Sequence, residues 1–232
     1  MSGDAHELQM RIGLGTAQFG SPYGITNKGQ PSRKECEKIV ETALDAGIVY
    51  FDTAAYYGEA DLILSSLLPS EGVRVVTKVK TPSEVQQSVD LFGRNLWGIL
   101  SDRFIAEGIR SGISVYWPIK IDPTAQIVQM PLNIADPRNL PLLRLYKAQD
   151  TEVHARSVFL QGLLLQRGAT IRQCLKYVLD KPVDVALVGV NSADELKEIL
   201  EAVETLEQEK CTDIPFIEPE MLDPRGWPNA NN

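Results

Sequence analysis

The chain has 232 residues, of which 44% are hydrophobic and 23% are charged, the ordinary balance of a globular protein with a sizeable core. Its net charge of −8 and the lack of any long run of Lys or Arg argue against nucleic acid or an anionic membrane surface as a partner. No apolar run is long enough to span a bilayer, and the acidic segment at residues 1–7 does not resemble a signal peptide.

The three cysteines, Cys36, Cys174 and Cys211, lie far apart and have no metal-binding spacing. Cys36 and Cys174 fall on the apolar faces of helical patterns, where a cysteine acts as a small buried hydrophobe. We therefore predict no metal site, and we expect the protein to reside in a reducing cytoplasm.

Extended apolar runs alternate with amphipathic helical patterns along the chain. The expected strands are residues 11–14, 48–51, 73–77, 109–115, 127–130, 153–159 and 183–188. Several of these runs are nearly continuous in Val, Ile and Leu, as expected for strands that are buried on both faces. The alternation predicts repeated strand–helix units around a parallel sheet.

Three helix starts carry the pattern of a capping box, in which a hydroxyl and a carboxylate three residues later each satisfy a backbone N–H group. The boxes pair Ser32 with Glu35, Thr81 with Glu84, and Ser192 with Glu195. Gly47 is expected to end the first of these helices.

The repeat of strand and helix is that of a TIM-type (β/α)8 barrel, a fold of about 250 residues. We predict a single domain over residues 1–232, with residues 1–9 and 219–232 as loose tails. No low-complexity segment or linker divides the chain.

The barrel is expected to be distorted or incomplete around its fourth strand. Between Lys78 and Gly108 the chain is too short for the helix, strand and helix that the barrel requires, and helical patterns at residues 83–89 and 96–107 fill the segment. Either residues 88–92 act as a makeshift fourth strand, or the barrel is open or seven-stranded. We favour the distorted barrel, because an unpaired strand edge leaves backbone groups unsatisfied.

Two segments place chemically useful side chains near the ends of consecutive strands. Residues 51–58 read Phe-Asp-Thr-Ala-Ala-Tyr-Tyr-Gly and residues 75–78 read Val-Val-Thr-Lys, so Asp52, Tyr57 and Lys78 are expected to lie at the active end of a barrel. A lysine beside a phenol lowers the pKa of that phenol, and an aspartate keeps the lysine charged and fixed. Such a trio can protonate a carbonyl oxygen while a hydride reaches the carbon.

These two segments resemble the hallmark of the aldo-keto reductase family, which is a Phe-Asp-Thr-Ala-x-x-Tyr-Gly segment followed by a Thr-Lys after the next strand. The resemblance implies that Asp52, Tyr57 and Lys78 are catalytic. The family also uses a histidine from its fourth strand, and this chain has none there. His6 lies in the expected N-terminal tail, and His154 opens the seventh barrel strand, away from the catalytic end.

Two strand ends resemble the family's binding site for the nicotinamide carboxamide. One is residues 111–116, with Ser114, and the other is residues 127–133, with Gln129. The resemblance implies that both side chains bind the carboxamide, while Val115 stands where the family has an asparagine.

Two further segments resemble regions of the family that bind the cofactor phosphates. After the seventh strand the implied contacts are Ser157 and Gly162. After the last strand Gly189, Asn191 and Ser192 lead into a helix, whose N-terminal N–H groups favour a phosphate. The implied cofactor is NADP, with NAD not excluded.

The resemblance implies an NAD(P)H-dependent reductase that transfers a hydride to a small-molecule aldehyde or ketone, sugar-like compounds included. The missing histidine motivates an alternative, a catalytically impaired protein of aldo-keto reductase descent that binds a nicotinamide nucleotide or a partner. A third hypothesis is a chain too unstable to function. Substrate identity and oligomeric state have no signature in the sequence.

Overall fold

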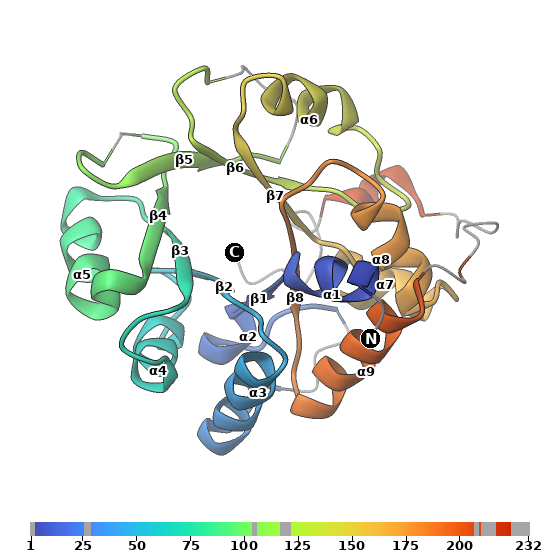
Figure 1. Ribbon diagram of the computed structural model, residues 1–232, viewed down its shortest axis with the longest axis horizontal. Coiled ribbons are helices and arrows are strands. Elements are labelled where there is room, and N and C mark those ends of the chain that lie inside the picture. The colour runs from blue at the N-terminus through green and yellow to red at the C-terminus, as the bar shows by residue number, and fades with distance from the viewer. Residues whose placement is uncertain are drawn as a thin grey trace.

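The computed structural model describes residues 3–25, 29–103, 106–116, 122–206, 209 and 217–223. Eight parallel strands pair in sequence order and close into a barrel, with β8 beside β1 (Figure 1). The strands are β1 (Ile12–Gly15), β2 (Tyr50–Ala54), β3 (Arg74–Lys78), β4 (Leu96–Leu100), β5 (Arg110–Ser114), β6 (Ile127–Pro131), β7 (Glu152–Arg156) and β8 (Val185–Gly189). The predicted TIM-type barrel is confirmed.

The fourth strand is where the sequence-based prediction fails. The helix expected at residues 96–107 is wrong, because Leu96–Leu100 forms β4 and pairs with β3 and β5. The makeshift strand at residues 88–92 is also wrong, because that segment ends helix α5 (Pro82–Phe92), and the closed sheet rules out an open or seven-stranded barrel. The apolar residues of β4 fit the spacing of a helix as well as that of a strand. Pairing with two neighbouring strands selects the extended form.

The expected distortion of the barrel around strand 4 is confirmed as an irregularity within a closed sheet. The register of β3 against β4 shifts, so that Val75 pairs with Leu96 and Val76 pairs with Gly98. Gly98 permits a close approach inside the barrel, because a Cβ at this position would overlap the side chain of Ile127.

The described residues supply fewer helices outside the sheet than the barrel plan requires. The helices that follow the strands are α2 (Ala17–Gly20), α3 (Arg33–Asp45), α4 (Ala60–Leu67), α5, α6 (Leu140–Lys147), α7 (Leu163–Gln166), α8 (Ile171–Leu179) and α9 (Ala193–Glu204), with 3-10 turns η1 (Gly93–Asn95) and η2 (Leu160–Gly162). In the connections that follow β4 and β5, the described residues contain no helix. Figure 1 accordingly shows the ring of helices open between α5 and α6.

The start of α5 forms the complete capping box that its sequence predicts, between Thr81 and Glu84. At the start of α3 only half of the box forms. The hydroxyl of Ser32 accepts a hydrogen bond from the Glu35 N–H at 3.2 Å, but the Glu35 carboxylate reaches the backbone N–H of Ala193 at the start of α9. The carboxylate therefore joins two neighbouring helices instead of closing its own box. Gly47, with a φ of +77°, follows the end of α3 as expected.

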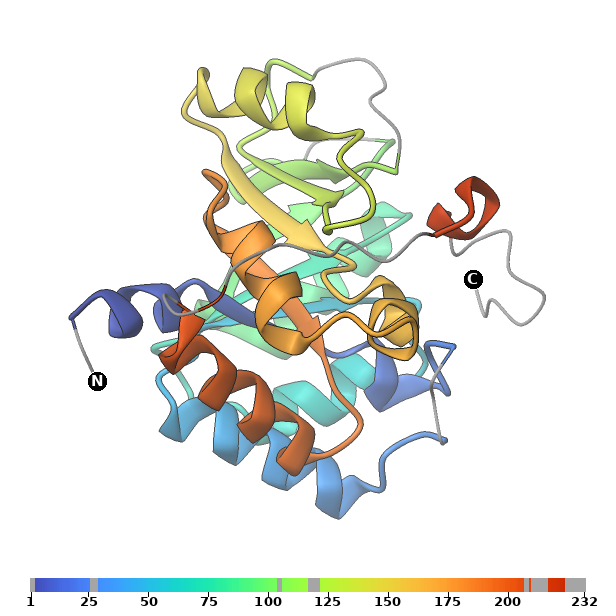
Figure 2. The same cartoon turned by 90° about the vertical axis from the view of Figure 1, so that its right-hand side faces the viewer.

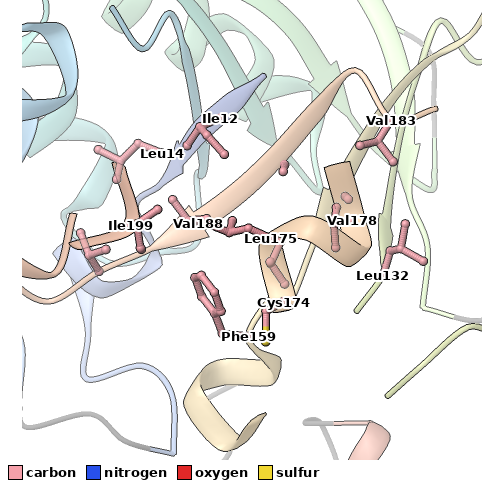
Figure 3. Close-up of a cluster of buried hydrophobic side chains, with 14 of the residues drawn as sticks. Ile12, Leu14, Leu132, Phe159, Cys174, Leu175, Val178, Val183, Val188 and Ile199 are labelled. Atoms are coloured by element: carbon pink, nitrogen blue, oxygen red, sulfur yellow. The ribbon is translucent and has the colours of Figure 1, made fainter. Parts of the chain in front are cut away.

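The main hydrophobic core lies between the strands and the surrounding helices. Figure 3 shows one part of it, with side chains from β1 (Ile12, Leu14), β8 (Val188), α8 (Leu175, Val178) and α9 (Ile199). Full burial of each such side chain contributes about 1.5–3 kcal/mol to folding. Cys36 and Cys174 are completely buried in this core, as predicted.

The interior of the barrel is polar near the amino ends of the strands. The indole N–H of Trp97 donates across the barrel to both carboxylate oxygens of Glu152 at 3.1 Å. Arg110 and His154 each place a nitrogen 2.8 Å from the same carboxylate. These side chains fill the amino end of the barrel, so space for a ligand is found at the carboxyl end.

The expected N-terminal tail contains a helix, α1 (Gly3–Met10), which packs against α9. Gln9 fixes it by donating to the carbonyl of Ala46 at 2.8 Å. Figure 2 shows α1 at one end of the barrel and the 3-10 turn η4 (Pro219–Leu222) on the opposite side. Among the described helices, none combines the length and the apolar character required to cross a membrane.

Candidate active site

A cavity of about 330 Å³ opens at the carboxyl ends of the strands. It is lined by the last residues of three strands, Gly15, Arg156 and Gly189, and by the middle residues of two more, Asp52 of β2 and Gln129 of β6. The loop after β7 and the start of α9 complete its wall. In α/β barrels this end of the sheet carries the active site.

Asp52 and Lys78 form a buried ion pair at this end of the barrel. The Lys78 Nζ lies 2.6 Å and 2.8 Å from the two carboxylate oxygens of Asp52. Gln129 donates its amide N–H to the same carboxylate at 2.6 Å, and Ser114 donates its hydroxyl to the Gln129 side chain at 3.2 Å. The structure thus brings four of the predicted site residues into one hydrogen-bonded chain.

Tyr57 faces the cavity from the loop after β2. Its ring centroid is 5.5 Å from the Lys78 Nζ. Burial raises the pKa of Tyr57 well above its ordinary value, and the negative charge of Asp52 acts in the same direction. The lowered pKa expected for this phenol is therefore not found, because burial outweighs the effect of the neighbouring Lys78.

Backbone and side-chain contacts fix the loop that carries Tyr57. The Tyr57 N–H donates to the Ala54 carbonyl at 2.9 Å, and the Tyr57 carbonyl accepts from the Ala60 N–H at 3.0 Å. The hydroxyl of Thr53 donates to the carboxylate of Asp61 at the start of α4. These contacts fix the backbone of the loop from which the phenol projects.

The fourth strand brings no imidazole to the cavity. Leu100, the last residue of β4, pairs with Lys78 and packs with Val76 and Ile127 inside the barrel. Ser101 follows it and is buried, but it is not among the residues that line the cavity. Neither side chain can replace an oriented imidazole N–H donor.

Most of the predicted cofactor residues reach the cavity. Ser157, Gly162, Gly189 and Asn191 line it together with Gln129, whereas Ser114 lies behind Gln129. Ser192 is absent from the lining and acts as the N-cap of α9, where its hydroxyl accepts from the Glu195 N–H at 3.2 Å.

The loop after β7 has unusual backbone geometry where it borders the cavity. Ser157, Leu160 and Gln161 have φ values of 58°, 47° and 53°, a region that residues with side chains rarely adopt. Such geometry costs about 1–3 kcal/mol per residue and concentrates at functional sites. Because Ser157 and Gln161 line the cavity, the strained loop supports a ligand-binding role for this wall.

Carboxylates already occupy the N-terminus of α9. The Ala193 N–H donates to Glu35 at 2.9 Å, and this bond lowers the pKa of the Glu35 carboxyl. The Glu195 carboxylate accepts a hydrogen bond from the Asn191 N–H at 2.7 Å, in place of the predicted bond from the Ser192 N–H. The N-terminus of a helix favours an anion, and here the carboxylates of Glu35 and Glu195 already take that place.

Several lining residues were not predicted from the sequence, namely Gln18, Arg156, Glu195 and Glu198. Arg156 had a usable signal, because it is the strand-end residue immediately before Ser157. Gln18 and Glu198 had none, since they reach the cavity from helices whose orientation depends on the closed barrel.

Part of the sequence matches a known family directly. Residues 11–91 match the model of the Aldo/keto reductase family. This segment runs from β1 to α5 and contains Asp52, Tyr57 and Lys78. No curated protein gives a significant match to the chain.

Solved structures share the fold over most of the chain. PA4992 from Pseudomonas aeruginosa, provisionally assigned as an aldo-keto reductase, has a TM-score of 0.67 at 19% identity, with 85% of this chain and 90% of that one covered. The aldo-keto reductase AKR11C1 from Bacillus halodurans, in its holo form, has a TM-score of 0.63 at 16% identity, with coverage of 92% and 95%. MGS-M4, an aldo-keto reductase from a Medee basin deep-sea metagenome library, has a TM-score of 0.58 at 15% identity, with coverage of 89% and 93%.

At these identities the structural likeness shows the fold. Together with the family match over residues 11–91, it confirms the resemblance to the aldo-keto reductases in a shortened form.

Proposed function

We propose that this shortened relative of the aldo-keto reductases is an NAD(P)H-dependent reductase that acts on a small-molecule aldehyde or ketone. The observation that carries the proposal is the buried Asp52–Lys78 pair beside Tyr57, which faces a cavity at the carboxyl ends of the strands. A phenol, a fixed ammonium and an enclosed space are the elements that protonation of a carbonyl oxygen requires.

Tyr57 is the proton donor in this proposal. Its raised pKa keeps the phenol protonated at neutral pH, so the O–H is available to a carbonyl oxygen that develops negative charge. As the carbonyl π bond opens, the Tyr57 proton moves to that oxygen, and solvent later restores the proton. Lys78, fixed by Asp52, stabilises the phenolate that is left behind. A reduced nicotinamide, when bound, supplies the hydride to the carbonyl carbon.

The chemistry of the cavity wall fits a nicotinamide dinucleotide. Gln18, Gln129 and Ser157 present neutral hydrogen-bonding groups, Gly162 allows a ligand to approach the backbone, and the lack of a side chain at Gly189 leaves room for the amide of Gln18. The strained loop after β7 lies along the same wall. These residues would hold the nucleotide, in keeping with the roles expected for Gln129, Ser157, Gly162, Gly189 and Asn191.

The part of the cavity beside α9 favours NADH over the NADPH expected from the sequence. Glu195 and Glu198 line this part of the wall, and Lys197 is paired with Asp194 at 3.1 Å. A carboxylate suits the 2′-hydroxyl of an unmodified ribose and repels a 2′-phosphate. We therefore propose that NADH binds at least as tightly as NADPH.

A second candidate is a protein of the same descent that binds the nucleotide without efficient catalysis. Leu100 and Ser101 occupy the end of the fourth strand, where the family brings a histidine. The loss of one oriented hydrogen-bond donor lowers the rate by about 10²–10³. This candidate predicts nucleotide binding with negligible reduction of any carbonyl compound.

The test combines nucleotide titration with a panel of aldehydes, ketones and sugars. NADH and NADPH are titrated into the purified protein while tryptophan emission is followed, and carbonyl reduction is then measured for wild type, Tyr57→Phe and Tyr56→Phe. We expect saturable micromolar binding to all three proteins and a loss of about 10²–10⁴ in kcat for Tyr57→Phe only. Tyr56 is the matched control, because it is exposed and lies outside the cavity lining. Undiminished turnover by Tyr57→Phe rules the mechanism out.

A further inference from the structure

Arg156 is a cationic side chain at the reacting end of the cavity for which the proposed mechanism has no use. It ends β7 and lines the cavity with Asp52, Tyr57 and Gln129. It shares a face of the strand with Glu152, whose carboxylate bonds Trp97 of β4 across the barrel interior. Side chains alternate along a strand, so Arg156 lies on the inward face.

The positive charge of Arg156 has no counter-charge bound to it. The guanidinium donates to two neutral acceptors, the Val115 carbonyl and the Ser157 hydroxyl, each at 3.1 Å. Among the ion pairs of the described residues, none involves Arg156, and the carboxylate of Asp52 is already bound by Lys78 and Gln129. The reacting end of the cavity therefore carries an uncompensated positive charge.

The guanidinium is also held in place before any ligand arrives. Its carbon lies 3.9 Å from the centroid of the Tyr116 ring, which fixes the plane of the group from one side. The two hydrogen bonds use two of the five N–H groups of an arginine. A half-buried and pre-oriented guanidinium of this kind is suited to a planar or tetrahedral anion with two oxygen atoms to offer.

The positive charge of Arg156 also acts on Tyr57, the proposed proton donor, and on its neighbour in the cavity wall, Tyr23. Burial raises the pKa of Tyr57 and of Tyr23, and Arg156 opposes this rise in both cases. Because Arg156 and Tyr57 line the same cavity, an anion that binds Arg156 lies in the space where Tyr57 would protonate a carbonyl.

We propose that Arg156 binds an anionic group of the carbonyl substrate, a carboxylate or a phosphate, so that the substrate class is 2-oxo acids and other carbonyl compounds with a nearby acidic group. The inference rests on the proposed reductase function and names its substrate class. A charged hydrogen-bonded anchor of this kind changes affinity by about 10- to 100-fold. The diphosphate of a bound nucleotide is the other source of the same chemistry, and the experiment separates the two.

The experiment uses matched pairs of carbonyl compounds that differ in one charge: pyruvate and pyruvamide, succinic semialdehyde and its amide, glyceraldehyde 3-phosphate and glyceraldehyde. Binding is measured by calorimetry and turnover by kcat/KM, for wild type, Arg156→Gln, Arg156→Lys and the control Arg144→Gln. Arg144 is exposed on α6 and lies outside the cavity lining, so Arg144→Gln removes one positive charge, as Arg156→Gln does, without changing the cavity.

For at least one pair, wild type is expected to bind the anionic member at least about tenfold more tightly than the neutral member. Arg156→Gln is expected to abolish this preference, Arg156→Lys to keep part of it, and Arg144→Gln to keep all of it. The affinities for NADH and NADPH stay within about twofold of wild type in every variant. An equal preference in Arg156→Gln and wild type, no preference in any pair, or a parallel loss of nucleotide affinity overturns the proposal.

Binding measurements on Tyr57→Phe separate this inference from the proposed function. If this variant and wild type both bind the anionic compounds through Arg156 but wild type reduces none of the panel, the reductase proposal fails and the anion site stands. If wild type reduces neutral and anionic compounds equally well, the anion site fails and the reductase proposal stands.

Discussion

The Lys78 Nζ lies 2.6 Å from Oδ1 and 2.8 Å from Oδ2 of Asp52, and the two residues are 5% and 7% exposed. The pair joins the carboxyl ends of β2 and β3, and Gln129 of β6 completes the coordination of the carboxylate. Taking two charges out of water is costly, and the pair persists only because its geometry and its hydrogen bonds are nearly complete. Its position in the barrel therefore has testable consequences for both stability and chemistry.

Lys78→Met is expected to destabilise the protein by about 3–5 kcal/mol, because it leaves the Asp52 carboxylate buried without its partner. The double variant Asp52→Asn/Lys78→Met is expected to recover part of that loss, since no unpaired charge remains. Urea denaturation of the four proteins in this cycle measures both effects. A single variant as stable as wild type would show that water reaches the pair freely.

Glu35→Gln is expected to lower the stability by about 0.5–1 kcal/mol at neutral pH, because a carboxylate at the N-terminus of α9 interacts favourably with the helix dipole. The bond from the Ala193 N–H lowers the folded-state pKa of Glu35 below the unfolded value. The contribution is therefore present above the unfolded pKa and disappears as the pH falls through the folded pKa. Denaturation at pH 7 and at pH 3 should show a smaller difference between the two proteins at pH 3; a constant difference contradicts the assignment.

Glu195→Gln and Glu198→Gln are each expected to improve the affinity for NADPH relative to NADH by about fivefold, the effect of removing one nearby like charge in a watery environment. Glutamine at position 195 still offers an oxygen to the Asn191 N–H, so the loop is expected to keep its shape. Fluorescence titration with both nucleotides gives the ratio of dissociation constants. Glu201→Gln, an exposed acid further along α9, is the control and should leave this ratio unchanged.

Gly20→Ala is expected to disturb the loop that carries Tyr57. A Cβ at residue 20 would overlap the backbone carbonyl of Tyr57, so the backbone must move, at a cost of about 1–3 kcal/mol. The nearest atom to a Cβ at Gly15 is 3.6 Å away, which is an ordinary contact, so Gly15→Ala is the stability control. Thermal unfolding of both variants measures the effect, and equal melting temperatures would count against close packing of the end of α2 on the loop that carries Tyr57.

The sequence predicted most of the barrel because its signals there are local. Buried parallel strands read as short runs of Val, Ile and Leu, and helix starts such as Thr81–Glu84 carry their own hydrogen-bonding partners. The positions of Asp52, Tyr57 and Lys78 followed from the motif, since strand ends converge at one rim of a barrel. The fourth strand was missed because Leu96, Ile99 and Leu100 also fit a helical spacing.

Local sequence by itself determined seven of the eight strands, the motif that carries the family resemblance and the placing of Asp52, Tyr57 and Lys78 towards the carboxyl ends of the strands. Only the tertiary structure decided that Leu96–Leu100 is a strand, that Asp52 takes up the charge of Lys78, that Glu35 and Glu195 occupy the start of α9, and that Arg156 lines the cavity without a counter-charge. The physical reason is distance along the chain. Pairing, burial and charge compensation join residues far apart in sequence, and these contacts exist only once the barrel has closed.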